Sequence, residues 1–158
     1  MTDLLPYVKM IEDELDKIQF PKSPENLYQP LEYFLGIGGK RIRPVLTLLA
    51  SEMFGIDAKT SISQAVSIEI FHNFTLIHDD IMDEAPLRRG NETVHQKWNT
   101  NIGILSGDAL LIKAYQFLAA TNKNVLSKNI DLFNCTALEV CEGQQLDMDF
   151  ETRGEVTI

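Results

Sequence analysis

Three aspartates stand close together within residues 78–83, near the middle of the sequence. In a helix of about 3.6 residues per turn, Asp79 and Asp83 lie about 40° apart and one turn along, with Asp80 about 100° from Asp79. Carboxylate oxygens are ligands that Mg²⁺ prefers, and Mg²⁺ bound by few carboxylates keeps positions for phosphate oxygens. Two carboxylates about 5 Å apart repel each other by roughly 3 kcal/mol at an effective dielectric of 20, which favours a bound cation. The spacing therefore indicates an Mg²⁺ site.

The same three aspartates also fit a solvated acidic patch, where repulsion between residues i and i+4 costs only about 0.2–0.5 kcal/mol. The residues before them are strongly apolar, which fits the wall of a cavity better than an exposed surface. These residues are Ile68, Ile70, Phe71, Phe74, Leu76 and Ile77. The metal site is therefore the favoured interpretation.

A glycine-rich basic stretch, residues 38–44, has the sequence GGKRIRP. Its glycines can bring backbone N–H groups close to an anion, and the helix that follows adds the positive end of its dipole. Lys40 and Arg43 can then bind phosphate oxygens by charge-assisted hydrogen bonds. The alternative is a set of helix-start charges on a solvated loop.

Two further features lie close to the aspartates along the chain. Arg88 and Arg89 begin five residues after Asp83, so they should lie near any phosphate on the metal, unless they form a plain basic turn. His72 precedes Asp79 by two helical turns and lies about 20° from it. It is either a ligand-binding residue or a hydrogen-bonded core histidine, and the case for His78 and His95 is weaker.

Apolar residues recur with helical spacing over most of the chain. We predict helices over about residues 4–18, 26–35, 44–55, 61–83, 102–120 and 125–150, the last one interrupted at Gly143. Residues 86–91 read as a charged loop, and no alternation typical of strands is present. The predicted fold class is all-α, a bundle of long helices in a single domain over residues 1–158.

Composition limits the classes of function. Apolar residues make up 44% of the 158 residues, and the net charge of −9 argues against general binding to nucleic acid or anionic membranes. No apolar run approaches the roughly 18 residues of a membrane span, and the N-terminus lacks a basic segment typical of signal peptides. Cys135 and Cys141 would point about 120° apart on a helix, so we expect buried thiols in a reducing, cytoplasmic compartment.

In their order and spacing, the motifs from about residue 36 to residue 150 resemble the trans-isoprenyl diphosphate synthase family. The resemblance joins GGKRIRP, the aspartates with His72 seven residues before the first of them, and Arg88-Arg89-Gly90. Two later motifs complete it, Gly107-Asp108 and Gly143-Gln144-x-x-Asp147. It implies an isoprenoid synthase-like all-α bundle and a homodimer.

The resemblance also assigns roles by position. It implies that Asp79 and Asp83 bind Mg²⁺, that Asp80 supports them, and that Arg88 contacts the allylic diphosphate. Isopentenyl diphosphate would be held by the side chains of Lys40, Arg43, His72 and Arg89. Gln144 would face the substrate cavity together with Asp147.

The implied reaction is ionisation of the allylic diphosphate, attack on the cation by the isopentenyl double bond, and loss of a proton. In the family, the side chains four and five residues before the first aspartate form a floor for the growing product. Here they are Thr75 and Phe74. A lone aromatic residue at the fifth position implies geranylgeranyl diphosphate as the main product, with farnesyl diphosphate as the alternative.

One departure from the family pattern is large. The family has a second aspartate-rich motif on a facing helix, and after Asp147 this sequence offers only Asp149, Glu151 and Glu155. We therefore expect the chain to be the N-terminal part of a larger bundle and to be inactive alone.

Two other functions fit parts of the pattern. An all-α metal-dependent phosphohydrolase could use His72, His78 and Asp79, but it would leave the basic motifs unexplained and would favour a transition metal over Mg²⁺. A non-catalytic, synthase-like partner subunit would have no need to retain the aspartates and arginines.

Overall fold

The computed structural model describes residues 4–152, with side chains described for residues 4–150, and it divides the chain after Thr121 into two compact units. The first unit contains every element up to the end of α6. The described part of the second unit, residues 122–152, contains one helix, α7. The expectation of one domain over residues 1–158 stays a prediction.

The first unit is almost entirely helical, as the sequence predicted. Its long helices are α1 (Leu5–Leu15), α2 (Glu25–Gly36), α3 (Ile42–Met53), α4 (Ile62–Met82) and α6 (Thr100–Ala119). A 3₁₀ turn, η1 (Ala58–Ser61), precedes α4, and a short helix, α5 (Val94–Lys97), precedes α6. The short α5 is missing from the sequence prediction because four residues carry too little periodicity to show a helix.

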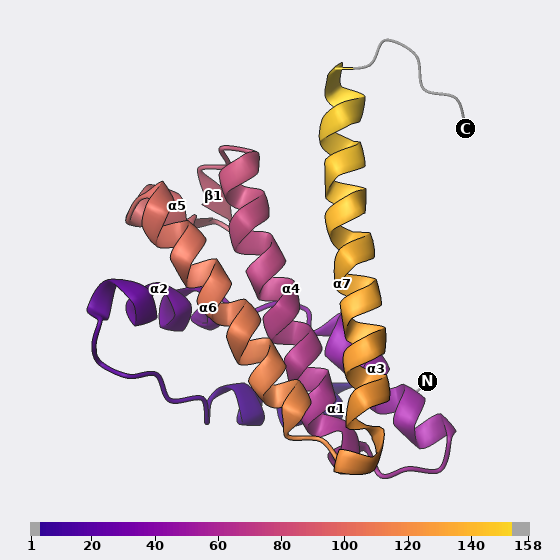
Figure 1. Ribbon diagram of the computed structural model, residues 1–158. Coiled ribbons are helices and arrows are strands. Elements are labelled where there is room, and N and C mark those ends of the chain that lie inside the picture. The colour runs from indigo at the N-terminus through magenta and orange to yellow at the C-terminus, as the bar shows by residue number, and fades with distance from the viewer. Residues whose placement is uncertain (1–3, 153–158) are drawn as a thin grey trace. The chain divides into compact units, whose positions relative to one another are not determined.

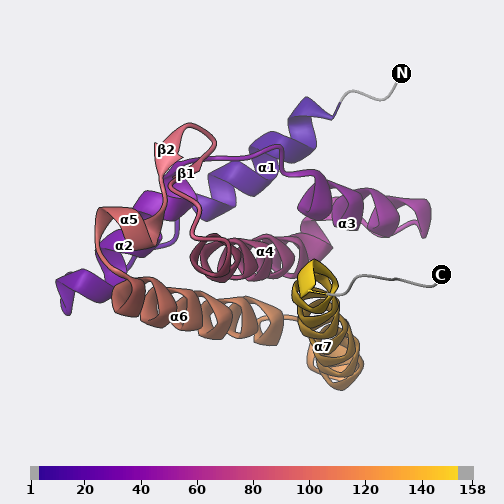
Figure 2. The ribbon, with the colours of Figure 1, turned by 90° about the horizontal axis from the view of Figure 1, so that it is seen from above.

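Helix α4 is the centre of this unit. It packs against α6 on one side and against α1 and α3 on the other, as Figure 2 shows from above. Its apolar side chains Val66, Ile70 and Ile77 are almost fully buried. A helix covered by neighbours on several sides needs apolar residues around most of its circumference, which explains the apolar run before the aspartates.

A two-stranded hairpin replaces part of the predicted charged loop. Strand β1 (Leu87–Arg88) pairs antiparallel with β2 (Asn91–Glu92), in the register Leu87↔Glu92 and Arg88↔Asn91. The sequence pattern did not reveal these strands, because strands of two residues are too short to show alternation. Figure 1 shows the hairpin beside the end of α4.

The predicted boundaries of α3 are close to those of the structure. Pro44 lies in the first turn of this helix, where its missing N–H leaves no hydrogen bond unmade. Gly55, with φ of +75°, follows the helix end, and its N–H donates to the Glu52 carbonyl at 2.9 Å. A left-handed residue just past a helix is a common helix stop, and glycine adopts it without steric cost.

The second unit corrects two predictions. Helix α7 (Lys123–Thr152) runs for 30 residues without an interruption at Gly143, because one glycine costs a helix only about 1 kcal/mol. Cys135 and Cys141 are exposed, so the expectation of buried thiols was wrong. Free cysteines are most often buried, but both positions fall on solvent-facing parts of this helix.

Helix α6 is apolar on average although it contains no continuous apolar run along its length. Over the part of the chain that the structure describes, α6 is the one helix long and apolar enough to cross a membrane, with a mean hydropathy of 1.3 in its best window. Scattered polar residues such as Asp108 and Lys113 interrupt any continuous run but leave the average high. In this structure α6 packs along α4 and α2.

Candidate active site

The three aspartates lie at the C-terminal end of α4. This helix ends at Met82, Asp83 is its C-cap, and Glu84 leaves the helix with φ of +50°. Asp80 is buried, Asp79 is partly exposed and Asp83 is exposed. Because the last carbonyl groups of a helix carry partial negative charge, this end adds to the attraction that the carboxylates exert on cations.

Arg88 connects two of these carboxylates. Its Nε donates to Asp80 Oδ1 at 2.7 Å, and its Nη2 donates to Asp79 Oδ2 at 3.1 Å. The Arg88 side chain is only 23% exposed, so solvent screens these charges weakly. The structure therefore brings together Asp79, Asp80 and Arg88, which the sequence had placed in one site.

Burial governs the protonation of Asp80. Its side chain is 1% exposed, and desolvation raises its pKa above the ordinary value, although the hydrogen bond and charge of Arg88 act in the opposite direction. Burial wins because only Oδ1 is paired, whereas Oδ2 is buried without a hydrogen-bond partner. Further positive charge near Asp80 would therefore stabilise the ionised form of its carboxyl group.

The hairpin holds the arginines at defined positions. Arg89 and Gly90 form its two-residue turn with φ of +53° and +79°, the backbone signs of a type I′ turn. Tyr33 on α2 donates its hydroxyl to the Glu92 carbonyl at 2.8 Å, and the buried Thr93 donates to the Ala85 carbonyl at 2.7 Å. These two bonds fix the base of the hairpin on the bundle.

A second, cationic group of side chains surrounds His72 on α4. Arg43 Nη1 lies 3.3 Å from His72 Nε2, and because a guanidinium only donates, this imidazole nitrogen must accept. Gly39 lies against Arg89, since a Cβ at this glycine would come within 2.7 Å of Arg89 Nη1. Arg43 and His72 are in contact, and the charge of Arg89 also acts on His72. The sequence assigned these three residues to one anion site, and we call Arg43, His72 and Arg89 the basic cluster.

Burial and the neighbouring arginines favour the neutral form of His72. Desolvation is the largest cause that lowers its pKa below 6.5, and the positive charge of Arg43 is the next. Arg89 and Arg88 lower it further, whereas Glu69 opposes them. A neutral imidazole among guanidinium groups leaves their net positive charge available to an anion.

This depressed pKa predicts a pH effect on stability. The unfolded chain binds a proton at His72 before the folded chain does, so the free energy of unfolding should fall as pH drops below about 6.5. It should level off below the folded-state pKa. Urea unfolding at pH 7.5 and pH 5.5 should show a smaller loss of stability for His72→Gln than for the parent protein. Equal losses would show that His72 does not contribute.

Arg41 has a structural role that the sequence analysis did not assign. It is 5% exposed, and its Nη1 donates to Glu69 Oε1 at 2.6 Å, where Glu69 is 3% exposed on α4. Arg41 adopts φ of +52° at the N-cap of α3, so the pair fixes the turn between Gly39 and Arg43. A signal was available in the sequence, since Glu69 is a charged residue within the most apolar helical stretch.

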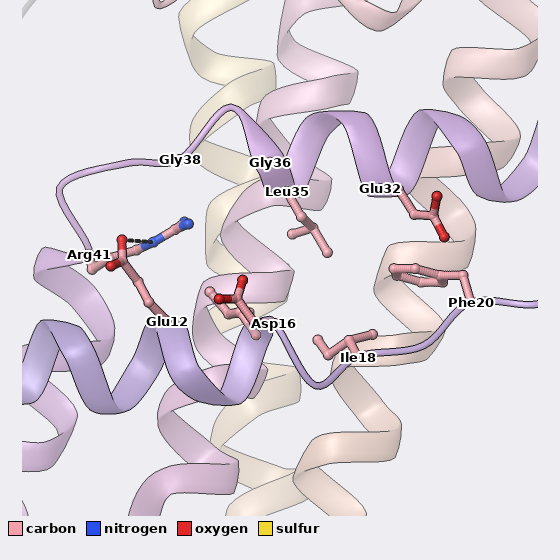
Figure 3. A pocket seen from close by; sticks show the side chains of 10 residues that line it. Glu12, Asp16, Ile18, Phe20, Glu32, Leu35, Gly36, Gly38 and Arg41 are labelled. Carbon is pink, nitrogen blue, oxygen red and sulfur yellow. Dashed lines mark ion pairs between the residues drawn. The ribbon is translucent and has the colours of Figure 1, made fainter.

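Lys40 is exposed beside this turn, and no hydrogen bond or ion pair within the described residues joins it to the basic cluster. A separate pocket of about 430 Å³ lies between α1 and α2, and Arg41 is one of its lining residues (Figure 3). Its charged lining comprises Glu12, Asp16, Glu32 and Arg41, and Arg41 Nε lies 3.9 Å from Glu12 Oε1. The pocket includes Gly38 and Arg41 of the glycine-rich stretch, but none of the side chains that the sequence predicted to bind metal or substrate.

The aspartates fit a magnesium ion by the chemistry of their donors. Asp79 and Asp83 offer partly or fully exposed carboxylate oxygens one helical turn apart. No group of three His, Cys, Asp or Glu side chains converges as a metal site within residues 4–150. Mg²⁺ commonly takes one or two carboxylates and completes its shell with water and phosphate oxygens, so the remaining ligands would come from those.

The imidazole nitrogens of His72 and His78 make contacts other than metal binding. His72 Nε2 is directed at Arg43, and His78 Nε2 lies 3.1 Å from the Ile104 carbonyl oxygen. The phosphohydrolase alternative needs these two imidazoles beside Asp79. Both nitrogens are otherwise engaged, which argues against that alternative.

The residues predicted to control product length lie on α4 before the aspartates. Phe74 and Thr75 are both half-buried, and the Thr75 hydroxyl donates to the His72 carbonyl at 2.8 Å. Gln144 and Asp147 lie on α7, where Gln144 is half-buried and Asp147 is exposed. Since α7 belongs to the second unit, their place in the site stays a prediction.

Known proteins resemble this chain in sequence and in structure. The family model described as polyprenyl synthetase matches residues 24–158. The geranylgeranyl diphosphate synthase of Methanosarcina mazei is 43% identical over 149 residues, which are 93% of this chain and 46% of that protein. The geranylgeranyl pyrophosphate synthase of Geoglobus acetivorans is 40% identical over 151 residues, 94% of this chain and 47% of that protein.

Solved structures agree with the sequence matches. A crystal structure of a geranylgeranyl pyrophosphate synthase superimposes with a TM-score of 0.95 at 50% identity, and it covers 100% of this chain and 48% of the other. The chain thus spans about half the length of the relatives that it matches.

Proposed function

Since the chain belongs to the polyprenyl synthetase family, we propose that this protein condenses an allylic diphosphate with isopentenyl diphosphate to give a short-chain polyprenyl diphosphate. The observation that carries the proposal is the pairing of two charged groups along α4. One consists of Asp79, Asp80 and Arg88, and the other is the basic cluster around His72. One group can hold a diphosphate through Arg88 and a bound cation, and the other can do so through its own positive charge two helical turns away, which suits two diphosphates that must react with each other.

Arg88 is proposed to bind the allylic diphosphate. Its guanidinium is held in place by Asp79 and Asp80, so it needs little reorganisation as negative charge grows on the departing diphosphate. Magnesium held by Asp79 and Asp83 would neutralise further charge on the leaving group. The apolar residues of α4 before the aspartates would exclude water from the allylic cation.

Isopentenyl diphosphate is assigned to the basic cluster, together with Lys40. The 158 residues hold one aspartate-rich motif where the family pattern has two, so we assign turnover to the complete gene product and expect this chain alone to be inactive. A homodimer and a cytoplasmic location stay predictions from the sequence. Geranylgeranyl diphosphate is the product that we propose, in keeping with the names of the relatives reported above.

Substitutions in the glycine-rich turn test the assignment of isopentenyl diphosphate. Lys40→Ala and Arg43→Ala should each raise its KM about tenfold or more, because each removes a charged hydrogen bond worth about 1.5–3 kcal/mol. The KM for the allylic substrate should change much less. Steady-state kinetics with each substrate varied in turn provides the measurement. An effect confined to the allylic substrate would mean that the two sites are assigned the wrong way round.

Phe74 is the proposed floor for the product. Phe74→Ser in the complete gene product should give products longer than geranylgeranyl diphosphate, because a small side chain removes the aromatic stop. Chromatography of the dephosphorylated products measures the distribution. If the variant and the parent enzyme give the same distribution, Phe74 is a packing residue and another side chain limits the length.

A further inference from the structure

His78 is held against α6 by contacts that leave its ring little freedom. Its Nε2 donates to the Ile104 carbonyl oxygen at 3.1 Å, and Asp108 Oδ1 lies 3.8 Å from the same nitrogen. The ring also occupies the space above Gly107, since a Cβ on this glycine would collide with Nε2 and Cδ2 of the imidazole. Glycine at this position of α6 therefore makes room for the imidazole.

The fixed imidazole in turn supports Phe74, one helical turn earlier on α4. The two ring centroids are 4.7 Å apart with an interplanar angle of 66°, an edge-to-face arrangement. On the other side, the Phe71 ring lies 5.6 Å from the Phe74 ring. The Phe74 ring thus lies between two rings of its own helix, and one of these, the His78 imidazole, is hydrogen-bonded to another helix.

This arrangement matters because Phe74 is only half-buried. A phenyl ring on a helix has more than one accessible rotamer unless its neighbours exclude the others. A growing isoprenoid chain that pressed on an unsupported ring could turn it aside. A ring supported by an imidazole that is itself hydrogen-bonded to α6 would resist that displacement.

We infer that His78 is a positioning residue for product length, which holds the Phe74 ring in place through its contacts with Ile104 and Gly107 on α6. The inference rests on the proposed function and on the proposed role of Phe74. It assigns a purpose to Gly107, a glycine of the Gly107-Asp108 motif that the two diphosphate sites do not use.

The product distribution of the complete gene product tests this inference. His78→Ala should lengthen the main product by at least one isoprene unit, and Gly107→Ala should act in the same direction by displacing the imidazole. The double variant with Phe74→Ser should give products no longer than those of Phe74→Ser alone, because both changes remove the same stop. His95→Ala serves as the matched control and should leave the distribution unchanged. Product ratio is the readout, since a change beside Asp79 can also alter the rate.

Two outcomes separate this inference from the proposed function. If Phe74→Ser lengthens the product while His78→Ala retains the parent distribution, His78 does not hold the ring and the inference is wrong. If the parent protein transfers no prenyl group at all, the proposed function fails, and the contact itself is tested by NMR of this chain. Long-range ¹H–¹⁵N spectra should then show a protonated His78 Nε2, and His78→Ala should shift the Phe74 ring signals. Unchanged Phe74 signals would overturn the inference.

Discussion

Replacing Asp79 by alanine in the complete gene product is expected to lower kcat for prenyl transfer by about 10²–10³-fold, the loss typical of removing one preorganised electrostatic group. The change removes a proposed magnesium ligand and also the partner of Arg88 Nη2, 3.1 Å away. Arg88 would keep its bond to Asp80, so the hairpin should retain its position. Initial rates at saturating concentrations of both substrates and Mg²⁺ provide the measurement.

The matched control for this variant is Asp131→Asn, which removes an exposed carboxylate on α7. It should leave kcat within a factor of about two, since isolated surface charges contribute little. Circular dichroism should show that the Asp79 variant keeps its helical content. A variant with the parent rate would refute the assignment of Asp79 to the metal and the departing diphosphate.

The second large effect is expected on stability. Arg41 and Glu69 form a buried ion pair 2.6 Å long, with both side chains at most 5% exposed. Arg41→Met leaves Glu69 buried without its ion-pair partner, and Glu69→Met leaves Arg41 with only the more distant Glu12, 3.9 Å away. Breaking a buried ion pair in this way typically costs about 3–5 kcal/mol. Arg41→Met or Glu69→Met should therefore lower the free energy of unfolding by about that amount, as measured by urea unfolding at pH 7.5.

The double variant separates a pair from two independent residues. Arg41→Met with Glu69→Met leaves no buried charge, so it should be less destabilising than the two single changes added together. Lys9→Met, which breaks an exposed ion pair with Asp13, is the control and should change stability by less than about 1 kcal/mol. Additive losses in the double variant would show that Arg41 and Glu69 act independently.

The sequence predicted the helices well because their apolar periodicity is strong and their ends carry local signals. Gly55 and Pro44 marked α3 by their own backbone preferences, and these positions were confirmed. The hairpin was missed because its position depends on tertiary bonds from Tyr33 and Thr93, which no local pattern reveals. Gly143 was given too much weight, since neighbouring helix formers outweigh a single glycine.

The candidate site was predictable to a similar extent. Helical spacing located the aspartates on one end of α4, and chain proximity brought Arg88 to them. Spacing could not show that Asp80 is buried with one unpaired oxygen, or that Arg43 faces His72. These details depend on the packing of α3 and the hairpin against α4. The exposed cysteines show the same limit, because residue type alone indicates only an average burial.

A single transfer assay tests the central claim most directly. The complete gene product is incubated with radiolabelled isopentenyl diphosphate, farnesyl diphosphate and Mg²⁺, and the products are separated by chain length. The account predicts incorporation of label into geranylgeranyl diphosphate, with loss of incorporation when a chelator removes the metal. Absence of labelled prenyl product, in a preparation that is folded and supplied with both substrates and Mg²⁺, would contradict the account.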